Sequence, residues 1–141
     1  MDIIIEMRDI YKTFPNNIKA LRRANLALEK GEIHSLVGEN AAGKTTLMNI
    51  LYGLVHADEG EILINGEKRH ITHPEDAIKY GIGMVHQHFK LVPGFTVLDN
   101  IILGTEECYV KYGWQIDYNK AKSAVKEILS KIKVDLDLNE R

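Results

Sequence analysis

A glycine-rich stretch, GENAAGKTT at residues 38–46, sets the tightest limit on the fold of this chain. It matches the pattern G-x-x-x-x-G-K-[ST] through Gly38, Gly43, Lys44 and Thr45. The apolar run IHSLV comes directly before the stretch, and LMNILYGL comes directly after it. This order predicts a short strand that leads through a glycine loop into a helix, which is the setting that the pattern requires.

The residue types in the loop suit the binding of phosphate groups. Small residues let successive backbone N–H groups surround phosphate oxygens, and the helix that follows directs the positive end of its dipole at the same anion. Lys44 would reach the outer phosphates as a point charge, and the Thr45 hydroxyl could ligate Mg²⁺. The alternative, a glycine-rich turn that merely contains a lysine, is disfavoured by the strand and helix on either side.

The rest of the chain alternates short strands and helices. Strand-like runs occur at residues 3–5, 26–28, 33–37, 62–64 and 84–86, and Asn65-Gly66 predicts a hairpin turn. Three further helices are expected: residues 74–80, a helix that runs through Leu103 from the Thr96–Asp99 capping box, and one that begins at Asp117 or Asn119. Apolar stripes mark the helix after the glycine loop (Leu47, Ile50, Leu51, Leu54) and the last helix (Ala121, Val125, Ile128, Leu129, Ile132).

Composition excludes several classes of protein. The 141 residues are 45% hydrophobic, which suits one globular domain, and the formal net charge of -2 gives no basic excess for nucleic acid. The single cysteine, Cys108, has no partner for a disulfide. No apolar run is long enough to span a bilayer. We therefore expect a soluble chain without a targeting segment, for which any membrane role depends on a partner.

Two segments resemble those of a known family. GENAAGKTTLMNILYGL resembles the Walker A segment of ABC-transporter ATPases, and GIGMVHQHFKLVPGFTVLDNIILG resembles their Q-loop region. The sequences of these segments are most similar to those of the ATPase subunits of bacterial simple-sugar and nucleoside importers. The likeness runs from about residue 3 to the end of the chain. The resemblance implies an α/β P-loop NTPase core with an N-terminal antiparallel β-region over about 1–95, and the beginning of a helical subdomain over about 96–141.

The resemblance also implies the roles of individual residues. Thr45 and Gln87 would help to hold Mg²⁺, and Gln87 would sense the γ-phosphate for a membrane partner. Thr46 would contact an inner phosphate, and Lys44 and Gln87 would serve catalysis. The ATP phosphates would lie against Gly38, Asn40, Ala41, Ala42, Gly43, Lys44, Thr45 and Thr46.

An aromatic residue of the β-region stacks on adenine in this family, and the segment KTFP places Phe14 in that role. Tyr11 is the other candidate, and Phe14 could instead be an ordinary packing residue. Ala41 departs from the family because a glycine is usual at its position. An alanine there costs roughly 1 kcal/mol if the backbone needs a positive φ, and nothing otherwise.

Several family motifs are absent from the 141 residues: the LSGGQ-like signature, the Walker B strand and the switch histidine. We therefore expect the N-terminal piece of a longer protein, truncated before the signature and inactive as an ATPase by itself. In the whole protein, ATP binding and hydrolysis would drive solute import at the inner face of the plasma membrane, with permease subunits and a second cassette as partners. The alternative is a soluble ABC-type ATPase or nucleotide-binding module that acts outside transport.

Two other patterns have simpler explanations. His86 and His88 would share one face of a strand, but no third ligand has a suitable spacing for a metal. The lysines of the last helix would be its solvated face rather than a phosphate-binding patch (Lys120, Lys122, Lys126, Lys131 and Lys133).

Overall fold

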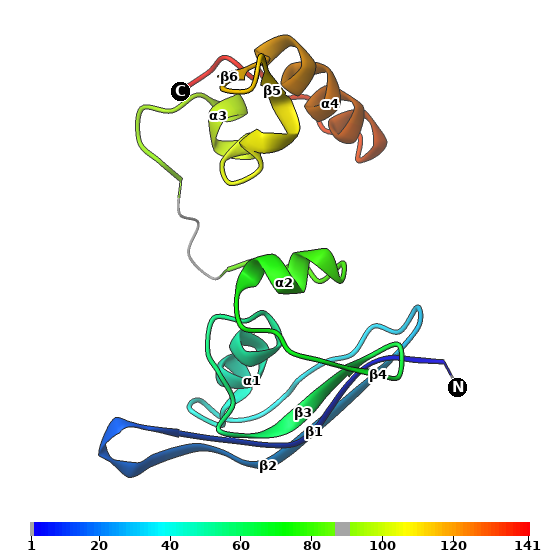
Figure 1. The fold of residues 1–141 in the computed structure, drawn as a ribbon, viewed down its shortest axis with the longest axis vertical. Coiled ribbons are helices and arrows are strands. Elements are labelled where there is room, and N and C mark those ends of the chain that lie inside the picture. Colours follow the sequence, from blue (N-terminus) through cyan, green and yellow to red (C-terminus); the bar gives the residue numbers. More distant parts are fainter. Residues whose placement is uncertain (1, 87–90) are drawn as a thin grey trace. The chain divides into compact units, whose positions relative to one another are not determined.

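A computed structural model of the chain describes residues 2–86 and 91–141, which form two compact units, Met1–Val85 and His86–Arg141. The first unit contains a four-stranded antiparallel sheet and two helices (Figure 1). The second contains two helices, a 3-10 turn and a two-stranded ribbon. Gln87 therefore lies outside the described residues, as does His88.

The sheet of the first unit has the order β2-β1-β3-β4, with β1 at Ile3–Phe14, β2 at Ile18–Glu29, β3 at Glu59–Ile64 and β4 at Glu67–Arg69. A 3-10 turn, Pro15–Asn17, joins β1 to β2. The predicted Asn65-Gly66 hairpin joins β3 to β4, and both of its residues have positive φ, as a tight two-residue turn requires. The strands β1 and β2 are much longer than their apolar runs predicted, because polar residues continue both strands on the exposed face.

Helix α1, at Lys44–Leu51, follows the glycine loop as predicted. Its buried residues, Leu47, Ile50 and Leu51, pack against the sheet in a core that also contains Met7, Ile10, Leu21, Leu26, Ile62, Ile64 and Ile71. Gly53 has φ +80° and lies against the backbone of His73, where an added Cβ would be 2.6 Å from the carbonyl carbon. The helix therefore ends before Leu54, which is 47% exposed and does not continue the predicted stripe.

Two predicted strands do not form. Residues 33–37 and 84–86 have no regular secondary structure and pair with none of the described strands. Ile33 and Val37 are 96% and 90% exposed. A strand exists only through the hydrogen bonds of a neighbouring strand, and neither segment belongs to the antiparallel sheet of β1 to β4 or to the β5–β6 ribbon.

Helix α2, at Pro74–Lys79, completes the first unit close to its predicted bounds. Proline begins the helix, where its missing N–H leaves no bond unmade. The Asp76 side chain accepts from the backbone N–H groups of Thr72 and His73 and from the Thr72 hydroxyl. These hydrogen bonds lower the pKa of Asp76, so the carboxylate stays ionised at the positive end of the helix.

The second unit contains α3 at Val97–Ile102, a 3-10 turn at Glu106–Tyr109, β5 at Val110–Lys111, β6 at Gln115–Ile116 and α4 at Tyr118–Lys131. Both predicted helix starts are confirmed, because Thr96 and Asp99 form a capping box and Asp117 accepts from the N–H groups of Asn119 and Lys120. The core contains Leu98, Ile102, Ala121, Val125 and Leu138. The predicted stripe on α4 is correct only in part, because Ile128 and Ile132 are 56% and 61% exposed. None of the helices in the described ranges is long and apolar enough to cross a membrane.

Candidate nucleotide-binding site

The glycine loop ends at Gly43, which is the residue before α1 and has φ +86°. Gly43 is buried against β2: an added Cβ would lie 2.5 Å from the Ala20 carbonyl oxygen and 2.7 Å from the Leu21 Cδ2. A side chain at this position would need both a left-handed backbone and space that the sheet already occupies. Glycine is therefore required here to bring the loop against the β1–β2 hairpin.

The start of α1 provides backbone donors for an anion. The first N–H of this region that bonds along the helix is that of Leu47, to the Gly43 carbonyl at 2.9 Å. The N–H groups of Lys44, Thr45 and Thr46 precede it, and helix geometry gives such groups no acceptor within the helix. Gly43 has no side chain to cap them. Three consecutive donors at the positive end of a helix fit a phosphate group well.

The Lys44 side chain turns back over the loop. Its Nζ donates to the carbonyl oxygens of Gly38 and Glu39, each at 2.6 Å. An ammonium group has three N–H donors, so two bonds to the loop leave one for another acceptor. The loop therefore holds a positive charge close to the helix start, as a phosphate-binding lysine requires.

The remaining loop residues are exposed: Gly38, Asn40, Ala41, Ala42 and Thr45, with Thr46 half-buried. Ala41, at a position where glycine is usual in the family, has φ +64°. Its backbone does adopt the left-handed region, so the alanine is strained by roughly 1 kcal/mol relative to glycine. A backbone hydrogen bond, from the Ala42 N–H to the Glu39 carbonyl oxygen at 3.2 Å, spans the loop at this point, in addition to the bonds from Lys44.

Phe14 is the last residue of β1 and pairs with Ile18 across the hairpin. It is half-buried and belongs to neither the buried core of the first unit nor the residues packed against that core. Lys12 Nζ lies 5.8 Å from the centroid of its ring. Tyr11 is also half-buried and lies farther from the hairpin tip, opposite Glu59 of β3. Because β2 contacts Gly43, the hairpin that carries Phe14 adjoins the glycine loop.

Two protein ligands of Mg²⁺ were predicted, and one of them, Thr45, lies among the described residues. Thr45 lies exposed in the first turn of α1, where its hydroxyl fits the ligand chemistry of a hard cation. The other predicted ligand, Gln87, falls outside the described ranges. Over those ranges, no group of three or more His, Cys, Asp or Glu side chains could hold a metal.

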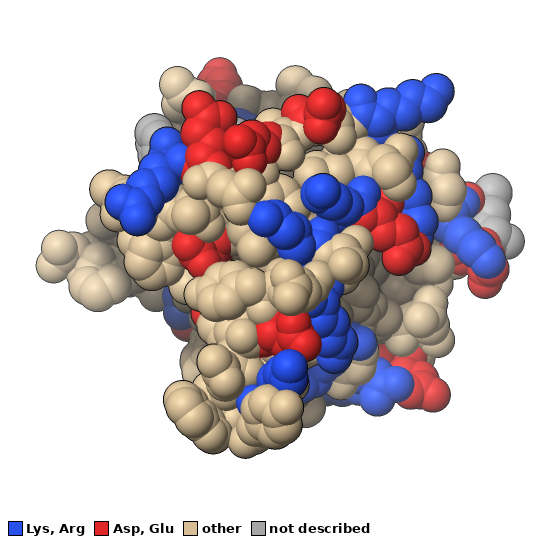
Figure 2. All heavy atoms as spheres, turned by 90° about the horizontal axis from the view of Figure 1, so that it is seen from above, with Lys and Arg blue, Asp and Glu red and all other residues tan. Residues whose placement is uncertain are grey.

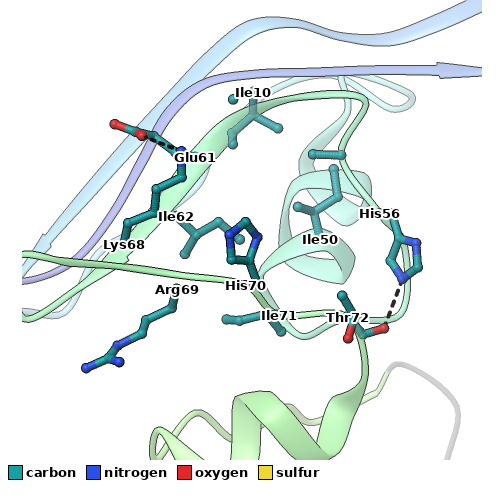
Figure 3. A pocket seen from close by; sticks show the side chains of 12 residues that line it. Ile10, Ile50, His56, Glu61, Ile62, Lys68, Arg69, His70, Ile71 and Thr72 are labelled. Carbon is teal, nitrogen blue, oxygen red and sulfur yellow. Dashed lines mark hydrogen bonds and ion pairs between the residues drawn. The ribbon is translucent and has the colours of Figure 1, made fainter.

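A separate hollow in the first unit lies between α1 and the β3–β4 hairpin (Figure 3). His56 and His70 approach it from different segments, and His56 Nε2 is bonded to the Thr72 carbonyl oxygen at 2.9 Å. Its volume of about 170 Å³ is small compared with ligand pockets of about 300 Å³ or more. It contains no residue of the glycine loop, so we do not place the nucleotide there.

The lysines of α4 do not form a free cationic patch. Lys120 donates to the Cys108 carbonyl, Lys122 to the Asn139 side chain, and Lys131 pairs with Glu127 at 2.8 Å. Figure 2 shows Lys and Arg side chains interspersed with Asp and Glu over the face in view. This mixture is typical of a solvated surface and gives no field of one sign that would attract a phosphate chain.

Asp58 is a residue of this region that sequence reasoning missed. Its carboxylate binds Lys12 Nζ at 2.7 Å and the Thr13 N–H at 2.6 Å, on the strand that carries Phe14. The partners lie more than forty positions earlier in the chain, so no local spacing could reveal them.

Comparison with known proteins identifies the family of this chain. The sequence profile of the family described as ABC transporter matches residues 21–141 of the chain. This chain belongs to that family. The guanosine import ATP-binding protein NupO of Bacillus subtilis (strain 168) is 53% identical over 128 residues, which cover 91% of this chain and 24% of NupO. The glucose import ATP-binding protein TsgD13 of Haloferax volcanii is 43% identical over 144 residues, covering 97% of this chain and 26% of TsgD13.

The fold agrees with solved members of the ABC transporter family. MJ1267, described as an ATP-binding cassette of an ABC transporter, superposes with a TM-score of 0.79 at 26% identity, over 100% of this chain and 58% of that one. The predicted fold class, an ABC ATPase core with an antiparallel β-region, is therefore confirmed. The chain spans about a quarter of the length of the curated relatives that it matches. Those relatives are ATP-binding proteins of sugar and nucleoside import, as the sequence predicted.

Proposed function

We propose that this chain binds the phosphates of Mg-ATP through Lys44 and the loop before α1, as the first part of an ABC importer ATPase. The observation that carries the proposal is the start of α1, where three backbone N–H donors and the Lys44 ammonium group lie at the end of the glycine loop. Phe14 stacks on the adenine, and Thr45 and Gln87 hold Mg²⁺. The metal supplies positive charge that neutralises the phosphate oxygens.

In the whole protein, ATP binding and hydrolysis would be coupled to the uptake of a solute, and the curated relatives favour simple sugars or nucleosides. The partners would be permease subunits in the membrane and a second cassette; one solved relative, MJ0796, is described as a dimer bound to ADP and Pi. We place the protein on the inner face of the plasma membrane. We further propose that residues from about 96 to 141, within the second unit, are the beginning of a helical subdomain.

Residues 1–141 should not hydrolyse ATP by themselves. Hydrolysis needs a positioned water and a group that orients it, in addition to charges that hold the γ-phosphate. The 141 residues contain no apolar run that ends in an acidic pair, so they lack the general base that this chemistry uses. A phosphate-release assay on this chain should therefore stay at background.

Uptake by cells tests the transport proposal. Cells that depend on the whole protein should lose the uptake of labelled sugar or nucleoside when Lys44 is replaced by Ala, and should keep it when the exposed Lys126 is replaced by Ala. Uptake that persists in Lys44→Ala cells, together with a protein that fractionates away from membranes, would favour an ABC-type ATPase that acts outside transport.

A further inference from the structure

Asp58 holds the end of strand β1 through three hydrogen bonds. It lies directly before β3, and its backbone N–H donates to the Tyr11 carbonyl oxygen at 2.9 Å. Its two carboxylate oxygens are used separately: Oδ1 accepts from Lys12 Nζ at 2.7 Å, and Oδ2 accepts from the Thr13 N–H at 2.6 Å. One aspartate therefore contacts three consecutive residues of β1.

These hydrogen bonds occur where β1 leaves the ladder of β3. The pairing of β1 with β3 has Tyr11 opposite Glu59 as its last pair, so the end of β1 continues without a backbone partner on that side. The Thr13 N–H is satisfied by the Asp58 carboxylate in place of a ladder carbonyl. On the other side, the pairing with β2 changes register between Lys12 and Thr13. On the β3 side, the strand end is thus positioned by the Asp58 side chain, whereas on the β2 side Thr13 and Phe14 still pair with Lys19 and Ile18.

Lys12 extends this arrangement to the aromatic ring. Its side chain is only 15% exposed, and its Nζ lies 5.8 Å from the centroid of the Phe14 ring, within the range of a cation–π contact. Asp58 is therefore connected to Phe14 by two routes, through the backbone of the neighbouring Thr13 and through the Lys12 ammonium group near the ring. The same hydrogen bonds, from Lys12 first and from Thr13 second, lower the pKa of Asp58, so it stays ionised at neutral pH.

We propose that Asp58 is a positioning residue for the adenine ring: it fixes Phe14 for stacking and thereby favours ATP over a bare phosphate chain. The inference rests on the proposed function, because it assumes that Phe14 faces the base while Lys44 and its loop hold the phosphates. Asp58 itself touches neither. Its removal should leave the phosphate loop intact and release only the end of the hairpin.

The test compares the binding of ATP with that of inorganic triphosphate by calorimetric titration of the chain. Asp58→Ala should weaken ATP binding about three- to tenfold, the range that the loss of a typical hydrogen bond gives. Triphosphate binding should change less than about twofold, since the phosphate loop is untouched. Asp58→Asn keeps an acceptor for Thr13 and loses the charge facing Lys12, so its effect on ATP should be smaller. Glu59→Gln, an exposed carboxylate one residue away, is the matched control and should bind both ligands as the unmodified chain does.

A double variant separates positioning from general stability. In a Phe14→Ala background the ring is gone, so Asp58→Ala should no longer weaken ATP binding. Equal weakening of ATP and triphosphate, or an effect that persists without Phe14, would overturn the role of Asp58 and leave the phosphate site standing. Unchanged binding of both ligands in Lys44→Ala would instead refute the phosphate site, and the role of Asp58 with it. If circular dichroism shows that Asp58→Ala is unfolded, Asp58→Asn is used in its place. The same comparison then applies: ATP binding should weaken more than triphosphate binding.

Discussion

At the residue scale, the glycine loop combines one position that only glycine can occupy with one where a side chain is tolerated under strain. Gly43 lies against the Ala20 carbonyl, so any Cβ would collide with the sheet. Ala41 also has positive φ but is exposed, so its Cβ is free of the sheet and only its backbone is strained. The loop can therefore depart from the family at Ala41 and keep its shape.

Replacing Ala41 with Gly should raise the free energy of unfolding by up to about 1 kcal/mol, because the left-handed strain is removed. Ala42 is the matched control: it is exposed in the same loop, and its φ is not positive. Ala42→Gly should lower stability by roughly 0.5 kcal/mol, since glycine gains entropy in the unfolded chain. Urea unfolding measures the free energy of unfolding of both variants. A more stable Ala42→Gly together with a less stable Ala41→Gly would contradict the positive φ of Ala41.

The proposed preference for adenine provides a second test at this scale. Phe14→Ala should weaken ATP binding about tenfold, as the loss of a base–aromatic stack does, and should leave triphosphate binding unchanged. Tyr11→Ala, on the same strand but farther from the hairpin tip, should have little effect on either ligand. The opposite pattern would identify Tyr11 as the stacking residue.

At the scale of the elements, local signals in the sequence predicted the helices well and the strands less well. Capping residues such as Thr96 and Asp117 act within three positions, so their sequence is enough to mark where a helix begins. Strands depend on distant partners: residues 33–37 have the composition of a strand, but no described strand pairs with them. For the same reason one motif was enough to predict the glycine loop and the helix that follows it, whereas the contact of Asp58 with β1 could not be predicted.

The start of α3 should make the second unit sensitive to acid. Hydrogen bonds from the Thr96 hydroxyl and then from the Thr96 N–H lower the pKa of Asp99. A carboxyl whose pKa is lower in the folded state stabilises it above its unfolded pKa of about 3.9, and this stability is lost as the pH falls through the lower, folded value. Urea unfolding between pH 7 and pH 2.5 should therefore show a smaller loss of stability in Asp99→Asn than in the unmodified chain. An identical pH dependence in the two would contradict the capping role.

At the scale of the whole molecule, the exposed apolar segment 33–37 should cause self-association. Ile33 and Val37 lie almost fully in solvent within a segment of high strand propensity and no proline, which favours pairing between chains. Light scattering at high concentration should show oligomers that Ile33→Thr/Val37→Thr reduces. Ile128→Thr/Ile132→Thr, two exposed residues on α4, is the control and should leave association unchanged. A monomer at every concentration would contradict this prediction.

The binding of ATP by the loop before α1 underlies every functional proposal for this chain, and calorimetric titration of Mg-ATP measures it directly. The unmodified chain and the control Lys126→Ala should bind ATP with the same affinity. Lys44→Ala should bind at least about tenfold more weakly, because it removes a charged donor to the phosphates. Equal affinity of Lys44→Ala and the unmodified chain would show that the loop before α1 does not hold the nucleotide.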